Sequence, residues 1–170
     1  MMTGSLIAPI ATVVHGLEGQ SGLAPTIRRA VVAALNASLP VTSIVSTRIF
    51  AIYKPESYTI PSLVCQLTSD SPGYSLTGAN GTSTAAFRCY CITKHLPDGE
   101  SLASAVREAL NCLVGTITIA GIGSVAVLWS IHDDEADEAF ESQDASGKPF
   151  AETRFSYRIR YRKPKPILSN

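Results

Sequence analysis

Charged side chains gather in two neighbouring segments near the C-terminus of this 170-residue chain. Residues 133–144 hold seven of the fourteen acidic residues and no Lys or Arg, whereas residues 154–165 hold six of the fourteen basic residues. Because opposite charges at short range form ion pairs, we expect the two segments to attract each other. The formal net charge of the whole chain is zero, which argues against a general nucleic-acid binder or a membrane-surface protein.

The basic segment alternates apolar and charged residues, which predicts a strand that is buried on one face only. The predicted buried face carries Phe155, Tyr157, Ile159 and Tyr161. The other face carries four candidate site residues: Arg154, Arg158, Arg160 and Arg162. Three interpretations stay open for these arginines: a solvent-facing strand, pairing with acidic residues of a neighbouring subunit, and contact with the phosphates of DNA.

The acidic segment is too polar for a core element, and we predict an exposed loop over residues 133–149. Its candidates for contact with another subunit are Asp133, Asp134, Glu135, Asp137 and Glu138. Residues 134–137 spell the acidic tetrad of a large helicase family, but the chain has no G-x-x-x-x-G-K-[ST] loop to hold the phosphates of a nucleotide. No spacing resembles a calcium-binding loop.

The other residues that could do chemistry form no catalytic or metal-binding pattern. There is no G-x-S-x-G motif, and no histidine stands in a nucleophile–base arrangement. Four cysteines are spread over the chain: Cys65, Cys89, Cys91 and Cys112. They contain no C-x-x-C pair, so we expect buried reduced thiols rather than a zinc site. Gly121 and Gly123 match the glycine fingerprint of dinucleotide-binding folds in letters, but strand-like residues follow them, so we expect a hairpin or bulge.

We therefore predict no catalytic residue, no cofactor and no metal. A small enzyme with an unrecognised site stays an alternative, because a fold can bring distant residues together.

The elements that must position these residues follow from their periodicity. Apolar residues recur at helical spacing over residues 25–37 and 100–113, with Pro25 at the start of the first helix and Asp98 as the N-cap of the second. Pro40 is expected to end the first helix. Extended segments are expected at residues 44–50, 62–68, 84–93, 116–119, 124–131 and 154–162, with turns at residues 71–73 and 78–81. A sheet covered on one face by the second helix is the expected core of an α+β domain.

The length predicts one domain, which we place at residues 25–163. Residues 1–24 show no convincing period and are expected to form an N-terminal arm, and residues 164–170 are expected to form a C-terminal tail. The apolar run at residues 6–14 is too short for a membrane span and lacks a basic start, so we expect neither a membrane anchor nor a signal peptide.

The order of these elements resembles the tail completion or tail terminator proteins of long-tailed bacteriophages, also called minor tail or head-to-tail joining proteins. The similarity covers about residues 26–162. It is carried by the segments STRIF, IPSLVCQL, AFRCYCIT, SLASAVREAL, ITIAG and TRFSYRIRYR. The most telling parts are STRIF, the Pro61 that opens the second strand, and the closing F-x-Y-x-I pattern. The N-terminal arm and the acidic loop depart from the shorter members.

The resemblance implies an α+β domain with a twisted, mainly antiparallel sheet packed against two helices, assembled into a hexameric ring. Such a ring caps the head-proximal end of the tail tube, ends tube polymerisation and joins tail to head, while DNA passes through its hole. The implied partners are further copies of the chain, the tail tube protein and a head-completion or connector protein. The implied locations are the virion tail and, during assembly, the cytoplasm of the bacterial host. An alternative is a small nucleic-acid-binding module that uses the basic final strand.

Overall fold

The computed structural model describes residues 26–52, 59–75, 78–111, 113–120, 123–144 and 147–163. Three helices and six strands are formed within these ranges. The helices are α1 (Ile27–Ala37), α2 (Leu39–Val45) and α3 (Leu96–Leu110). The strands are β1 (Ile49–Phe50), β2 (Ser62–Ser75), β3 (Gly78–Thr93), β4 (Gly115–Ile119), β5 (Gly123–Gln143) and β6 (Pro149–Arg162).

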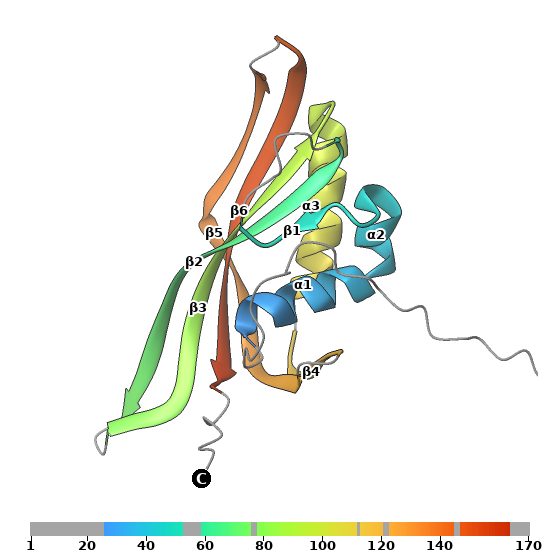
Figure 1. Ribbon diagram of the computed structural model, residues 1–170. Helices are drawn as coiled ribbons and strands as arrows, with labels where there is room; N and C mark the ends of the chain where they lie inside the picture. Colours follow the sequence, from blue (N-terminus) through green and yellow to red (C-terminus); the bar gives the residue numbers. More distant parts are fainter. Residues whose placement is uncertain are drawn as a thin grey trace, which may run out of the picture.

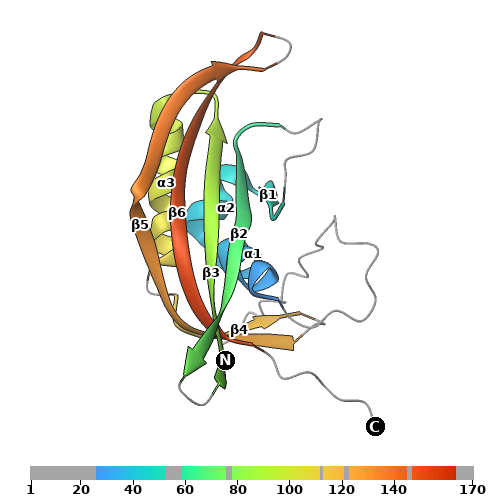
Figure 2. The same ribbon diagram turned by 90° about the vertical axis from the view of Figure 1, so that its left-hand side faces the viewer.

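The strands form one sheet in the order β1-β2-β3-β6-β5-β4. β1 and β2 are parallel, and all other neighbours are antiparallel. All three helices lie against the same face of this curved sheet (Figures 1 and 2). The hairpins β2–β3 and β5–β6 extend past the helices in opposite directions (Figure 1). The expected sheet packed against helices is therefore confirmed, but the described residues form three helices rather than two.

The core lies between the helices and the middle of the sheet. Alternate residues of β6 are fully or almost fully buried, as the sequence predicts for Phe155, Tyr157, Ile159 and Tyr161. The helices contribute Val31, Leu35, Leu102 and Val106 to the same cluster. Cys65, Cys89 and Cys91 are free and buried in it, which confirms the expectation for these three thiols. Cys112 lies outside the described residues.

The first helix was predicted well, but the effect of Pro40 was not. Thr26 caps α1, because its Oγ1 accepts a hydrogen bond from the backbone N–H of Arg29 at 3.4 Å. Pro40 does not simply stop this helix: it occupies the first turn of α2, where a helix does not need the missing N–H. The expected extended segment at residues 44–50 is therefore wrong except for β1, which holds only Ile49 and Phe50.

The helix α3 begins and ends earlier than predicted. Its N-cap is His95 and Asp98 lies within its first turn, so Asp98 is not the cap. Pro97 stands at the helix start, where its lack of an N–H costs nothing. A Cβ on Gly99 would lie 2.8 Å from Oγ1 of Thr153, so glycine lets α3 approach β6 closely at this point. The helix ends at Leu110, and Gly115 is the first residue of β4.

The two predicted turns lie inside strands. Residues 71–73 belong to β2 and residues 78–81 belong to β3, and Pro72 pairs with Ser83 across the two strands. A register shift between Pro72 and Tyr74 and positive φ angles at Gly78 and Gly81 absorb the turn-type residues within a long hairpin. The connection itself falls at residues 76–77, which lie outside the described ranges.

The predicted exposed loop at residues 133–149 is also wrong for most of its length. Its backbone continues β5 to Gln143 and pairs with β6, and the described turn begins only at Asp144. Asp133 pairs with Ser156 and Glu138 pairs with Arg154, so residues 134–137 stand opposite the single residue Phe155 as a bulge. A polar sequence is compatible with this part of the strand. Pairing with β6 satisfies the hydrogen-bonding groups of its backbone, and the side chains of residues 141–143 are exposed to solvent.

The segment after Gly123 is strand, as expected from its apolar, β-branched residues. β4 and β5 pair as an antiparallel hairpin, with Ile119 opposite Gly123, so no helix opens at this glycine. A dinucleotide-binding turn would need that helix, and the hairpin interpretation is confirmed. Gly121 itself lies outside the described residues.

Candidate assembly surface

The helices cover one face of the sheet, and we call the face that turns away from them the outer face (Figure 1). The arginines of β6 lie on the outer face. Its residues alternate with the buried ones along β3 and β6, so Arg158 and Arg160 point away from a core that holds Tyr157 and Ile159. The outer face brings together the four predicted arginines and two of the predicted acidic residues: Arg154, Arg158, Arg160, Arg162, Asp133 and Glu138.

Arg154 is held by carboxylates and aromatic rings. Its guanidinium forms ion pairs with Glu152 and, at 3.5 Å, with Glu138, and it lies 4.4 Å from the ring centroid of Phe140. Partial burial acts to lower the pKa of Arg154, but the hydrogen bond and charge of Glu152, followed by the charge of Glu138, outweigh it and raise the pKa. Arg154 is therefore charged and paired with carboxylates of its own chain.

Arg158 pairs with Asp133, and the distance between Nε and Oδ2 is 3.1 Å. The predicted attraction between the acidic and basic segments is therefore confirmed, and it operates within one chain. This ion pair and the pair of Arg154 with Glu138 are both accessible to solvent, since the side chains of Arg158 and Glu138 are 56% and 65% exposed. Pairs of this kind contribute about 0–1 kcal/mol to stability.

The predicted contact between these acidic residues and a neighbouring subunit stays a prediction. The backbone of residues 134–137 lies in β5, but the side chains of Asp134, Glu135 and Asp137 are outside what the structure describes. Their partners are therefore not assigned.

Arg160 and Arg162 lie at the opposite end of the outer face from Arg154. Arg160 donates to Oγ1 of Thr82 at 3.3 Å, and no carboxylate of the described residues lies within ion-pair distance of either arginine. Arg88, on the neighbouring strand β3, is exposed on the same face and has no such carboxylate either. Arg88 was not among the predicted site residues. It stands between Phe87 and Cys89 in an alternating strand, and this pattern predicts that its side chain lies on the other face from theirs.

Aromatic and aliphatic side chains stand between the arginines on the outer face. Trp129 pairs with Arg160 and Ile131 pairs with Arg158 across β5 and β6, and Ile131 is 53% exposed. The guanidinium of Arg154 lies 5.5 Å from the ring centroid of Tyr90. Arginine and aromatic residues are enriched at protein interfaces, so the outer face has the composition of a contact surface.

On the opposite face, a polar network joins the ends of β2, β3 and β6 beyond the helices. Asp70 accepts hydrogen bonds from Oγ of Ser83 and, at 2.8 Å, from the hydroxyl of Tyr161, and Nζ of Lys163 lies 3.8 Å from it. Burial raises the pKa of Tyr161, and the hydrogen bond to Asp70 and its charge raise it further. The neutral phenol is therefore the form that the fold stabilises.

The stability advantage given by the Tyr161 hydroxyl is expected to disappear at alkaline pH. The pKa of Tyr161 is raised in the folded chain, whereas the tyrosine of the unfolded chain ionises at about pH 10. Above this pH the folded chain therefore keeps a phenol proton that the unfolded chain loses. The free energy of unfolding then falls by up to about 1.4 kcal/mol per pH unit. Tyr161→Phe lacks this loss, but loses about 1–2 kcal/mol at neutral pH with the hydrogen bond to Asp70.

Urea unfolding of both proteins at several pH values from neutral to alkaline measures this difference. The gap in free energy of unfolding between wild type and Tyr161→Phe should narrow as the pH rises through about 10. A gap that is constant over this range would show that the hydroxyl does not titrate differently in the folded state.

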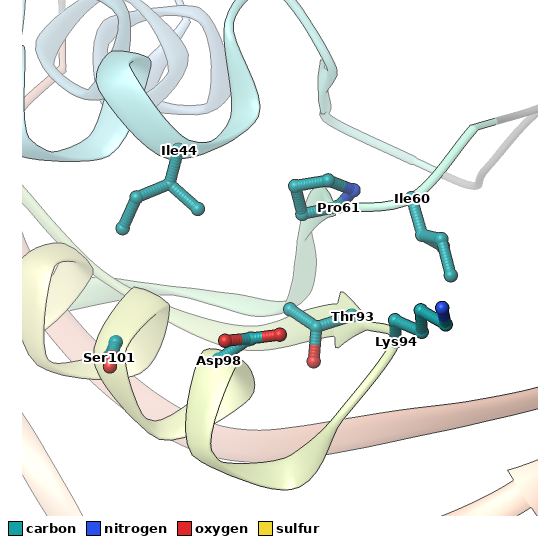
Figure 3. A pocket seen from close by; sticks show the side chains of 7 residues that line it. All are labelled: Ile44, Ile60, Pro61, Thr93, Lys94, Asp98 and Ser101. Atoms are coloured by element: carbon teal, nitrogen blue, oxygen red, sulfur yellow. The ribbon is translucent and has the colours of Figure 1, made fainter.

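A pocket of about 370 Å³ lies between α2, the start of β2 and the start of α3 (Figure 3). It is lined by Ile44, Ile60, Pro61, Thr93, Lys94, Asp98 and Ser101. Its two hydroxyls donate to backbone carbonyls, Thr93 to His95 and Ser101 to Pro97. Neither is bonded to a basic side chain, which an activated nucleophile needs. The pocket therefore has the chemistry of a small surface cavity with one carboxylate and one amine.

Two further features can be stated for the described part of the chain. It contains no group of three or more His, Cys, Asp or Glu residues placed to hold a metal ion. None of its helices is long and apolar enough to cross a membrane.

No protein-family model and no curated protein sequence matches this chain. Among solved structures, its fold is similar to that of a chain from the virion of a native gene transfer agent particle, with a TM-score of 0.54 and 18% sequence identity. The similarity covers 80% of this chain and 94% of that chain. The two chains therefore share a fold over nearly the whole length of the virion chain.

Proposed function

We propose that this chain is a structural protein of a phage-like virion, and that it forms a hexameric ring at the head-proximal end of the tail tube. The ring ends tube polymerisation and joins the tail to the head. The observation that carries the proposal is the fold shared with a chain of a gene transfer agent virion over 94% of that chain. The resemblance of six segments to tail terminator proteins agrees with it and supplies the position in the tail.

The surface of the chain supports a role in assembly. A ring needs heterologous contacts, in which one patch of a subunit binds a different patch of the next. We propose the acidic residues of β5 (Asp133, Asp134, Glu135, Asp137 and Glu138) and the arginines Arg154 and Arg158 of β6 as complementary patches. The ion pairs of Asp133 and Glu138 within the chain are exposed and weak, so exchange for a partner in the next subunit costs little.

The proposed role is structural and involves no catalysis and no cofactor. Its partners are further copies of the chain, the tail tube protein and a head-completion or connector protein. The protein acts in the virion tail and is assembled there in the cytoplasm of the bacterial host. The single-domain prediction for residues 25–163, with an N-terminal arm and a C-terminal tail, belongs to the same proposal.

Deletion of the coding sequence in a host that produces the virion tests this role. Electron microscopy of the lysate should show tail tubes of variable, excessive length and heads without tails, because nothing stops tube growth or joins the two parts. Expression of the intact chain in trans should restore joined particles of uniform tail length. Joined particles with normal tails in the deletion strain would contradict the proposal.

A further inference from the structure

The arginines of the outer face divide into two groups with different surroundings. Arg154 and Arg158 are neutralised by Glu152, Glu138 and Asp133 of the same chain. Arg160 and Arg162 of β6 and Arg88 of β3 have no carboxylate within ion-pair distance among the described residues. The three arginines without a carboxylate lie on two neighbouring strands, and we call them the arginine cluster.

The register of the two strands places Arg88, Arg160 and Arg162 along the outer face. Arg160 pairs with Thr84, Arg162 pairs with Thr82, and Arg88 pairs with Ser156. Between Arg88 and Thr84 on this face of β3 lies Ala86, whose partner on β6 is Arg158. The β3 partners of Arg160 and Arg162 are small and neutral, so on this side nothing bulky keeps a large partner from the guanidinium groups, while Trp129 flanks Arg160 on β5.

The chemistry of the cluster selects the partner. A guanidinium binds a phosphate through two parallel hydrogen bonds and keeps its charge at any working pH. An acidic surface of another subunit is the competing partner, but the carboxylates of the outer face that the structure describes are paired with Arg154 and Arg158. A polyanion from outside the ring is therefore the better match.

We propose that Arg88, Arg160 and Arg162 form a sequence-independent contact site for the phosphate backbone of double-stranded DNA. This inference rests on the proposed function, which brings DNA through the ring. Phosphate contacts hold DNA without reading its sequence, which suits a surface that every part of a genome must pass. Arg154 and Arg158 are excluded from the site, because their charges are balanced within the chain.

The salt dependence of DNA binding measures the number of phosphate contacts. Each contact adds about 0.9 to the slope of log affinity against log salt concentration, so three contacts weaken binding roughly 40-fold between about 50 and 200 mM salt. The probe is a short fluorescently labelled DNA duplex of arbitrary sequence, and fluorescence anisotropy gives its affinity for the full chain at several salt concentrations.

The test compares two triple variants that remove the same charge. Arg88→Ala, Arg160→Ala and Arg162→Ala together should lower the affinity at low salt at least 10-fold and reduce the slope by about 2–3. The control combines Arg29→Ala, Lys94→Ala and Lys148→Ala, which lie away from the cluster, and should stay within about twofold of wild type. Replacing the three cluster arginines by lysine should preserve most of the slope, because it keeps the charge.

The mass of each variant in solution is measured beside its DNA affinity, which separates this inference from the proposed function. An assembled wild type that binds no DNA, or equal losses in both alanine triples, would overturn the DNA site and leave the ring standing. An alanine triple that loses its assembly while DNA affinity is unchanged would assign the cluster to a subunit contact instead. A monomer that binds DNA through the cluster would support the site and contradict the ring.

Discussion

Leu35→Ala should lower the free energy of unfolding by about 2–5 kcal/mol, because it removes a fully buried side chain and leaves a cavity between α1 and the sheet. Leu39→Ala is the matched control four residues further along the chain. Leu39 is 81% exposed at the start of α2, so its replacement should change stability by no more than about 0.5 kcal/mol.

Urea unfolding of the two variants, at protein concentrations where the mass is that of one chain, measures the contrast. Equal losses for Leu35→Ala and Leu39→Ala would mean that α1 does not pack on the sheet as described. Because Leu39 is so exposed, its side chain is available for contact with a neighbouring subunit. If Leu39→Ala leaves stability unchanged, the same variant can be used to test whether Leu39 takes part in assembly.

Phe155→Ala should destabilise the fold by about 3–5 kcal/mol. Phe155 is fully buried on β6 beneath α3, its ring meets that of Tyr157 edge-on with centroids 6.0 Å apart, and the guanidinium of Arg107 lies 4.9 Å from its centroid. The substitution therefore removes the aromatic contact that links the helix to the strand carrying the arginines.

Phe140→Ala on β5 provides the comparison for Phe155→Ala. Phe140 is only half-buried and its main described contact is with Arg154, so about 1 kcal/mol is expected. Thermal unfolding should place the Phe155→Ala midpoint well below that of Phe140→Ala, because each kcal/mol shifts the midpoint by about 2–4 °C in a chain of this size. Coinciding midpoints would contradict the described core.

The elements with an unbroken pattern were predictable from the sequence. β6 alternates over its whole arginine-bearing half, and α1 has helical spacing with a threonine cap, so local physics and tertiary packing agree at both places. The buried face of β6 and the outward direction of Arg154, Arg158, Arg160 and Arg162 followed directly from the two-residue period.

The errors arose where a local preference met a stronger constraint from the whole sheet. Pro40 ends one helix and starts another, which a rule about helix interiors does not distinguish. The acidic residues of β5 and the glycines of β3 lie in hairpins that extend past the helices, where strand pairing determines the structure and no apolar face is required.

Part of the candidate site depended on contacts that a sequence cannot show. Ion pairing between Arg158 and Asp133 requires the register of β5 against β6, which includes two shifts. The addition of Arg88 to Arg160 and Arg162 requires the knowledge that β3 and β6 are neighbours, because α3, β4 and β5 lie between these two strands in the sequence. The network around Asp70 likewise joins three strands that only the fold brings together.

The mass of the full chain in solution tests the ring most directly. Light scattering over a concentration series, at low and at moderate salt, gives the absolute mass without a shape assumption. The account predicts a mass that rises with concentration toward six times the 18.0 kDa of one chain, and that falls when salt weakens the charged contacts. A mass of 18.0 kDa at every concentration and both salt levels would contradict it.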